Sequence, residues 1–325
     1  MATMWQQMIC VVLIAISPLM TSSPTDSAHA PSPFVPGGDL MAADDASPAF
    51  TPDGNTVYFM RGTERGAAVM ESRRVDGQWS APMVAPFSGR WRDGDPAMAP
   101  DRSFLVFASN RPASGVGQAL DTVRGGKRLA GQGMNLWQVE RRADGWGEPV
   151  RLPDIVNTCN STFAPSIAAD HSIYYIGCSP DGVLRPLRSV FEHGQYQPPY
   201  LVTVGDKNAQ IRDVAIAPDR SFMVFSIKHE PSQPYRLAIA FHTDDNWSTP
   251  QDLGDTVNGG THNMGSQLGC DHRTLYFSSD RALPAALSGK TSKANADHMW
   301  RVSLAPWLAR LGDRLVAAAA SCMAG

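Results

Sequence analysis

Acidic, basic and amide side chains gather at five places in this 325-residue chain, each just ahead of a short apolar segment. These side chains are Asp44, Asp45, Arg92, Asp93, Asp95, Asn157, Asn160, Arg212, Asp213, His262 and Asn263. Carboxylates brought to one point could act as a general acid and base, bind a divalent cation, or recognise a polar ligand. Which chemistry is available depends on whether the fold brings the five places together.

The apolar segments that follow are copies of one phrase centred on an aspartate. The copies read SPAFTPDGNTVYFM, DPAMAPDRSFLVFA, APSIAADHSIYYIG, DVAIAPDRSFMVFS and GSQLGCDHRTLYFS. Their central residues are Asp53, Asp101, Asp170, Asp219 and Asp271, at intervals of 48, 69, 49 and 52 residues. Self-similarity at such a period indicates stacked supersecondary units.

Each copy predicts a β-hairpin, because apolar residues flank an Asp-Gly, Asp-Arg or Asp-His pair that reverses the chain. A third strand follows, and then an aromatic residue three positions before a proline leads into a fourth. These pairs are Trp79/Pro82, Trp146/Pro149, Tyr196/Pro199 and Trp247/Pro250. The fifth such proline, Pro33, precedes the first hairpin. We therefore predict an all-β fold, a five-bladed β-propeller of four-stranded blades, closed by pairing the N-terminal strand with the C-terminal blade.

The phrases FASNRP, NLWQVERRADGWGEPVRL and TLYFSSDRA resemble the WD-like repeats of TolB-type propellers, which occur in many exported bacterial proteins. The resemblance covers residues 31–304 and implies a scaffold whose function lies in its loops. The chain departs from TolB in having five countable blades instead of six and no separate N-terminal α/β domain. We interpret the repeated aspartates and tryptophans as structural, and we expect Arg111 and Arg281 to brace loops.

The first thirty residues differ from the rest. The apolar stretch MICVVLIAISPLM is too short to span a bilayer, and the following polar stretch ends in Ala28-His29-Ala30, a pattern typical of signal-peptidase sites. We predict a signal peptide over 1–30, cleaved after Ala30, and a periplasmic or secreted protein. We predict the propeller over 31–304, a short C-terminal helix or tail over 305–325, and no transmembrane segment.

Removal of the signal peptide would leave four cysteines of the five. Cys159 and Cys178 flank one predicted hairpin and could face each other across it, so we predict a disulfide between them. The alternative is that all four are buried as small apolar residues.

The composition excludes several function classes. A net charge of −3 lacks the basic footprint of a nucleic-acid binder. The stretch GGKRLAGQG lacks the spacing of a phosphate-binding loop, and no G-x-S-x-G motif is present. We expect no cofactor, no nucleic-acid partner and a monomer.

Connections in an antiparallel blade alternate ends, so the loops before the innermost strands share one face with the loops between second and third strands. Two long insertions, 113–133 and 282–296, map to that face. We predict a ligand-binding funnel there, built from Asp45, Arg92, Asp93, Asp95, Asn160, Arg212, Asp213, His262 and Asn263. Asp95 and Asp213 share one repeat position; they could instead cap strands or pair with Arg92 and Arg212.

Three functions fit such a funnel. The first, which we predict, is binding of a protein, small-molecule or glycan ligand of unknown identity. The second is a carbohydrate-active hydrolase with Asp45, Asp95 and Asp213 as candidates, which requires two carboxyl groups about 5 to 9.5 Å apart. The third is a divalent cation held by His262 among the carboxylates, but a single histidine is weak support, so we predict no metal.

Overall fold

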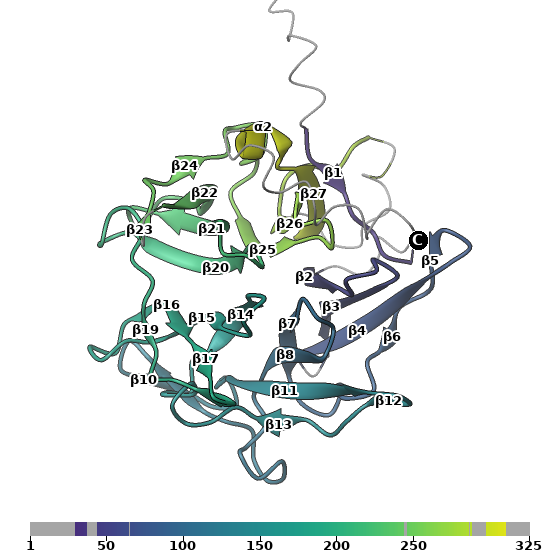
Figure 1. Ribbon diagram of the computed structural model, residues 1–325, viewed down its shortest axis with the longest axis vertical. Helices are drawn as coiled ribbons and strands as arrows, with labels where there is room; N and C mark the ends of the chain where they lie inside the picture. The colour runs from purple at the N-terminus through teal and green to yellow at the C-terminus, as the bar shows by residue number, and fades with distance from the viewer. Residues whose placement is uncertain are drawn as a thin grey trace, which may run out of the picture.

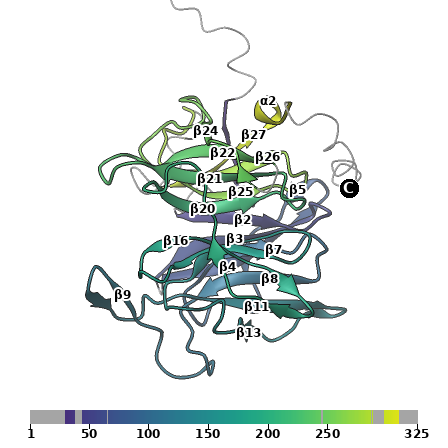
Figure 2. The same cartoon turned by 60° about the vertical axis from the view of Figure 1, so that its left-hand side comes forward.

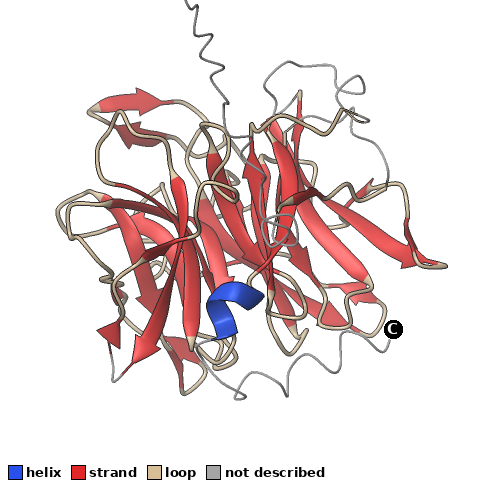
Figure 3. Ribbon diagram, turned by 90° about the horizontal axis from the view of Figure 1, so that it is seen from above, coloured by secondary structure: helices blue, strands red, loops and turns tan. Residues whose placement is uncertain are grey.

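The computed structural model describes residues 30–37, 44–64, 66–243, 246–285, 287 and 297–309. The predicted signal peptide before Ala30, most of insertion 282–296 and the tail after residue 309 lie outside these ranges. No helix within them is long and apolar enough to cross a membrane. One helix is described, α2 (Ala305–Leu308), which is drawn in blue beside the red strands in Figure 3.

Five antiparallel sheets surround a central axis (Figure 1), so the predicted five-bladed β-propeller is confirmed. Blade one contains β2 (Asp45–Phe50), β3 (Thr56–Thr63), β4 (Gly66–Val75), β5 (Gln78–Trp79) and β6 (Met83–Val84). Blade two contains β7 (Asp93–Met98), β8 (Phe104–Ser109), β11 (Asn135–Arg142), β12 (Gly145–Trp146) and β13 (Val150–Arg151). Blade three contains β14 (Phe163–Ile167), β15 (Ile173–Cys178), β16 (Leu184–Ser189) and β19 (Tyr200–Leu201), with the small hairpin β17 (Phe191–Glu192) and β18 (Gln195–Tyr196) beside it.

The last two blades complete the ring. Blade four contains β20 (Gln210–Ile216), β21 (Phe222–Lys228), β22 (Arg236–Thr243), β23 (Asn246–Trp247) and β24 (Gln251–Asp252). Blade five contains β25 (Asn263–Leu268), β26 (Thr274–Ser279), β27 (His298–Ser303) and, as its outermost strand, β1 (Ser32–Pro33). The strands β2, β7, β14, β20 and β25 are innermost and line the axis (Figure 1).

The two ends of the ring are joined as predicted. Pro33 of β1 is in register with Trp300 of β27, and the Phe34 N–H donates to the Met299 carbonyl at 2.8 Å. The Phe34 ring then packs against Tyr276 of blade five, with ring centroids 4.9 Å apart. Closure in this way leaves no unpaired strand edge between the first and last blades.

The turn aspartates are structural, in agreement with the sequence. In each blade a backbone N–H two residues later donates to the carboxylate of the turn aspartate, as in an Asx-turn. The residue directly after each turn aspartate has a positive φ. In three blades its side chain contacts the carboxylate of the turn aspartate of the preceding blade. These pairs are Arg102–Asp53 at 2.7 Å, His171–Asp101 at 2.9 Å and Arg220–Asp170 at 2.9 Å.

The core lies between neighbouring blades. The apolar residues six positions after each turn aspartate are all fully buried: Phe59, Phe107, Ile176, Phe225 and Phe277. Trp146 of blade two packs against blade one and donates from Nε1 to the Tyr58 hydroxyl at 3.1 Å. Arg111 and Arg281 brace loops as expected, each by donating to backbone carbonyls and lying over two aromatic rings.

Candidate functional site

All five innermost strands carry a β-bulge at the same position. In each strand the register shifts there, and one residue adopts a positive φ. These residues, which we call the axial ring, are Ser47 (52°), Asp95 (47°), Ala164 (50°), Asp213 (50°) and Gly265 (67°). Left-handed backbone is uncommon outside glycine, and a bulge re-aims the side chain it carries. The ring therefore presents two carboxylates, from blades two and four.

Hydrogen bonds link the axial ring from blade to blade. Ser47 Oγ donates to Asp95 Oδ1 at 3.1 Å, and the Ala164 N–H donates to Asp95 Oδ2 at 3.3 Å. The Gly265 N–H donates to Asp213 Oδ2 at 3.0 Å. Within the described part of the chain, neither carboxylate forms a salt bridge with an arginine.

The environment of the ring disfavours negative charge. Burial raises the pKa of Asp213 to about 6, and the nearby charge of Asp95 adds to the increase. Burial also raises the pKa of Asp95, against the hydrogen bonds from Ser47 and Ala164. Both aspartates retain some exposure, so solvent reaches the ring.

Three other predicted residues lie at the start of an innermost strand and accept side-chain hydrogen bonds from residues in or just after the second strand of the same blade. Asp45 accepts two hydrogen bonds from Arg61, both at 2.7 Å. Asp93 is fully buried and accepts one from Arg111 at 2.9 Å, among others. Asn263 is buried and accepts one from a serine of β26 at 3.0 Å. Because these polar groups are engaged within the protein, we leave the three residues out of the proposed site.

The remaining predicted residues are spread around the same face. His262 Nδ1 lies 2.8 Å from Asp297 Oδ2, and this hydrogen bond raises the pKa of His262. Asn160 is exposed and donates to the Asp121 carbonyl at 3.0 Å. The Arg92 backbone N–H donates to the side-chain amide oxygen of Asn110, which directly follows β8. Among the residues that the structure describes, no three His, Cys, Asp or Glu side chains are grouped to hold a metal ion.

A pocket of about 670 Å³ opens on this face, between blades three, four and five. We call it the funnel pocket. Loops before innermost strands and loops between second and third strands both line it, as the alternation of connections requires. Its walls include Val123, Phe163, Ile211, Arg212, Tyr235 and Met264.

The insertion 113–133 forms one edge of the funnel pocket. It contains a hairpin of β9 (Thr122–Arg124) and β10 (Lys127–Leu129), turned at two glycines with positive φ, Gly125 and Gly126. Figure 2 shows β9 projecting from the body of the propeller. Thr122 Oγ1 and Ser161 Oγ lie 2.6 Å apart, which anchors the hairpin of blade two to blade three.

A disulfide joins Cys159 and Cys178 beside the pocket. It connects the loop before β14 to the end of β15, and Cys178 itself lines the wall. The crosslink limits the movement of this wall relative to the strand that carries Phe163.

Arg212 is the distinctive polar residue of the funnel pocket. Its guanidinium lies over the Phe163 ring, 5.8 Å from the centroid. One terminal nitrogen, NH1, is buried and has no hydrogen-bond partner among the described residues. A buried donor without a partner is costly, so this atom marks a position where a ligand acceptor would be stabilised.

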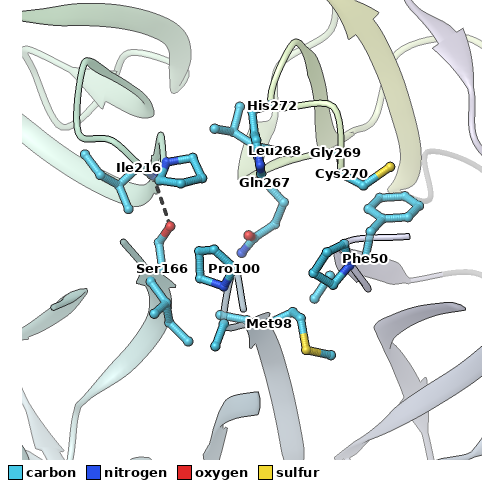
Figure 4. A pocket seen from close by; sticks show the side chains of 16 residues that line it. Phe50, Met98, Pro100, Ser166, Ile216, Gln267, Leu268, Gly269, Cys270 and His272 are labelled. Atoms are coloured by element: carbon cyan, nitrogen blue, oxygen red, sulfur yellow. Dashed lines mark hydrogen bonds between the residues drawn. The ribbon is translucent and has the colours of Figure 1, made fainter. Parts of the chain in front are cut away.

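The opposite end of the axis offers a much smaller space. Residues from all five blades line it, and Figure 4 shows the Gln267 side chain surrounded by Met98, Pro100 and Ile216. The cavity measures about 70 Å³, whereas ligand pockets usually measure about 300 to 1,000 Å³. Of the two ends of the axis, the funnel face therefore carries the candidate site.

The sequence predicted one of the six wall residues named above, Arg212, and missed the others. Tyr235 and Met264 were not among the predicted residues, although Met264 directly follows Asn263 and Tyr235 starts a predicted third strand. An aromatic residue at the funnel end of a third strand is the signal that could have identified Tyr235.

No protein-family model matches the chain, and no curated protein matches its sequence. Among similar solved structures, TolB from Acinetobacter baumannii is 14% identical with a TM-score of 0.46, over 80% of this chain and 54% of that chain. A protein of unknown function from Dyadobacter fermentans is 14% identical with a TM-score of 0.45, over 85% and 86%. The GH43_1 enzyme from Xanthomonas citri is 12% identical with a TM-score of 0.48, over 85% and 91%.

The propeller fold of this chain is shown by its own five antiparallel sheets. The chain spans about half the length of the Acinetobacter baumannii protein. The function is therefore proposed from the residues of the funnel face and not from these similarities.

Proposed function

We propose that this protein is an exported propeller that binds a small organic anion in the funnel pocket. The observation that carries the proposal is that Arg212, a residue of the pocket wall, has a buried NH1 with no hydrogen-bond partner among the described residues. Leaving such a donor unpaired costs about 1 to 3 kcal/mol, and a ligand carboxylate would remove that cost. The planar guanidinium suits a carboxylate, which can accept two parallel hydrogen bonds.

The other residues that line the pocket indicate the chemical character of the rest of the ligand. Phe163, Tyr235 and Met264 surround the position of Arg212 with aromatic and apolar surface, and Val123 adds apolar surface from the hairpin. A volume of about 670 Å³ lies within the range of small-molecule sites. We therefore expect a carboxylate with an aromatic or apolar body.

The test is a binding screen by thermal shift and calorimetry with aromatic and aliphatic carboxylates, each paired with its uncharged amide. We expect the wild type to bind a carboxylate and Arg212→Gln to bind it at least about tenfold more weakly. Arg142→Gln, an exposed arginine of β11, is the matched control and should bind like the wild type. Equal affinity of Arg212→Gln and the wild type, or of acid and amide, would contradict the proposal.

A carbohydrate hydrolase is the second candidate, and the pKa of Asp213 favours it. A carboxyl group with a pKa of about 6 close to a second carboxylate is the pairing that such enzymes use. Since Asp45 is held by Arg61, the pair would be Asp95 and Asp213. Hydrolysis of aryl glycosides by the wild type, lost in Asp213→Asn, would support this function; no hydrolysis across a panel of glycosides would eliminate it.

Export is the part of the proposal that the disulfide supports. Disulfides persist in oxidising compartments and are rare in the cytosol, and Cys159 and Cys178 form one. Cell fractionation with thiol labelling should find the protein in the periplasm or medium with both cysteines blocked. Recovery from the cytoplasm with both thiols reactive would contradict export.

A further inference from the structure

The axial ring holds more negative charge than its hydrogen bonds balance. Asp95 accepts two hydrogen bonds, from Ser47 and Ala164, and Asp213 accepts one, from Gly265. The charge of Arg92 lowers the pKa of Asp95, and the charges of Arg212 and His262 lower the pKa of Asp213, but no lysine or arginine within the described ranges makes a salt bridge to either carboxylate. Two neighbouring carboxylates with few hydrogen-bond donors would be stabilised by a further positive charge bound directly between them.

A buried hydroxyl points to the same place. Ser278 of β26 is 4% exposed, and its Oγ has no hydrogen-bond partner among the described residues. A Cβ atom built on Gly265 would lie 3.5 Å from Ser278 Oγ and also 3.5 Å from Ser47 Oγ. Both hydroxyls therefore lie beside the ring position of blade five, and that position carries no side chain.

A second buried hydroxyl, on the neighbouring strand of blade four, is in the same state. Ser226 of β21 is fully buried and unpartnered within the described chain, and it stands opposite Arg212 in the register, next to Asp213. Buried polar atoms are nearly always satisfied by protein, water or an ion. Of the two hydroxyls, Ser278 is the one that lies at the ring itself, and its missing partner favours a bound species there.

We propose that the axial ring binds one hard divalent cation of the Ca²⁺ type through Asp95, Asp213, Ser47 and Ser278. All of these donors are oxygens, the ligands that Ca²⁺ prefers, and the absence of His and Cys among the four disfavours Zn²⁺. Ca²⁺ takes six to eight oxygens, so water would complete the shell. The ion would connect blades one, two, four and five at the axis.

The experiment uses the full-length mature protein, stripped of metal with EDTA and then dialysed. Calorimetry and thermal shift are run with CaCl₂, with MgCl₂, and with NaCl at matched ionic strength. We expect one Ca²⁺ bound per chain and a rise in melting temperature of about 5 °C or more at saturation. Asp95→Asn and Asp213→Asn should lose binding, and Ser278→Ala should weaken it at least about tenfold.

Asp255→Asn is the matched control, because Asp255 is an exposed carboxylate paired with Arg236. It should bind Ca²⁺ like the wild type. Circular dichroism of each variant separates loss of the site from loss of the fold, and Ser278→Ala changes no charge. Absence of divalent binding by the wild type, as expected if the ring holds only water, would overturn the proposal. Unchanged affinity in Asp213→Asn would overturn it as well.

Discussion

Replacing Asp213 with asparagine should stabilise the metal-free protein at neutral pH. Asparagine keeps an acceptor for the Gly265 N–H and tolerates the positive φ of 50° at this position better than most residues. What it removes is a negative charge that the ring does not balance. The substitution therefore tests the electrostatics of the ring with little change in its geometry.

The magnitude follows from the pKa of Asp213. The folded protein raises it from 3.8 to about 6, so the folded state binds a proton that the unfolded state has already released. The contribution of Asp213 to stability is present in full below pH 4 and is lost as the pH rises to about 6. The full difference corresponds to about 3 kcal/mol, and the partial exposure of Asp213 reduces the expected gain to about 1 to 3 kcal/mol.

Urea denaturation in EDTA from pH 4 to pH 8 measures this effect. The free energy of unfolding of Asp213→Asn minus that of the wild type should be near zero at pH 4 and should grow to a plateau above pH 6. Asp255→Asn should show no such rise. A difference that is constant across this range, or a variant less stable than the wild type at pH 8, would refute the reasoning.

Three further substitutions test other contacts, all by urea denaturation at neutral pH. Arg111→Ala would leave the fully buried Asp93 without its cation and should cost about 3 to 5 kcal/mol; a cost under about 1 kcal/mol would contradict a structural role. Replacing Cys159 and Cys178 with alanine removes a crosslink across 19 residues and should cost about 3 kcal/mol; a cost under about 1 kcal/mol would contradict a stabilising role. Phe34→Ala removes the buried ring that packs where blades five and one meet, and it should lower the free energy of unfolding by about 3 to 5 kcal/mol. Truncation of an exposed valine of β6 should cost little.

The sequence was enough to predict which face of the propeller carries the candidate site. It predicted few of the contacts that the side chains on that face make. The face follows from counting strands, because connections alternate ends in every antiparallel blade. The partners depend on side-chain orientation: Asp93 and Asp95 are two residues apart, yet one is paired with Arg111 and the other lies in the axial ring. The shared repeat position of Asp95 and Asp213 did indicate their common location. Ser47, Ala164 and Gly265 occupy the same repeat position, and together they complete the ring.

The amino-acid sequence by itself determined the number of blades, the hairpin turns and the closure at Pro33. These features depend on local chemistry, namely the Asx-turn, the alternation of buried residues and the spacing of prolines, which act over a few residues and repeat five times. Only the tertiary structure decided that a bulge aims two carboxylates at the axis and that a hairpin of blade two is anchored to blade three. It also decided that, among the described residues, NH1 of Arg212 has no hydrogen-bond partner. Such contacts join residues from different blades, and their geometry exists only once the ring has closed.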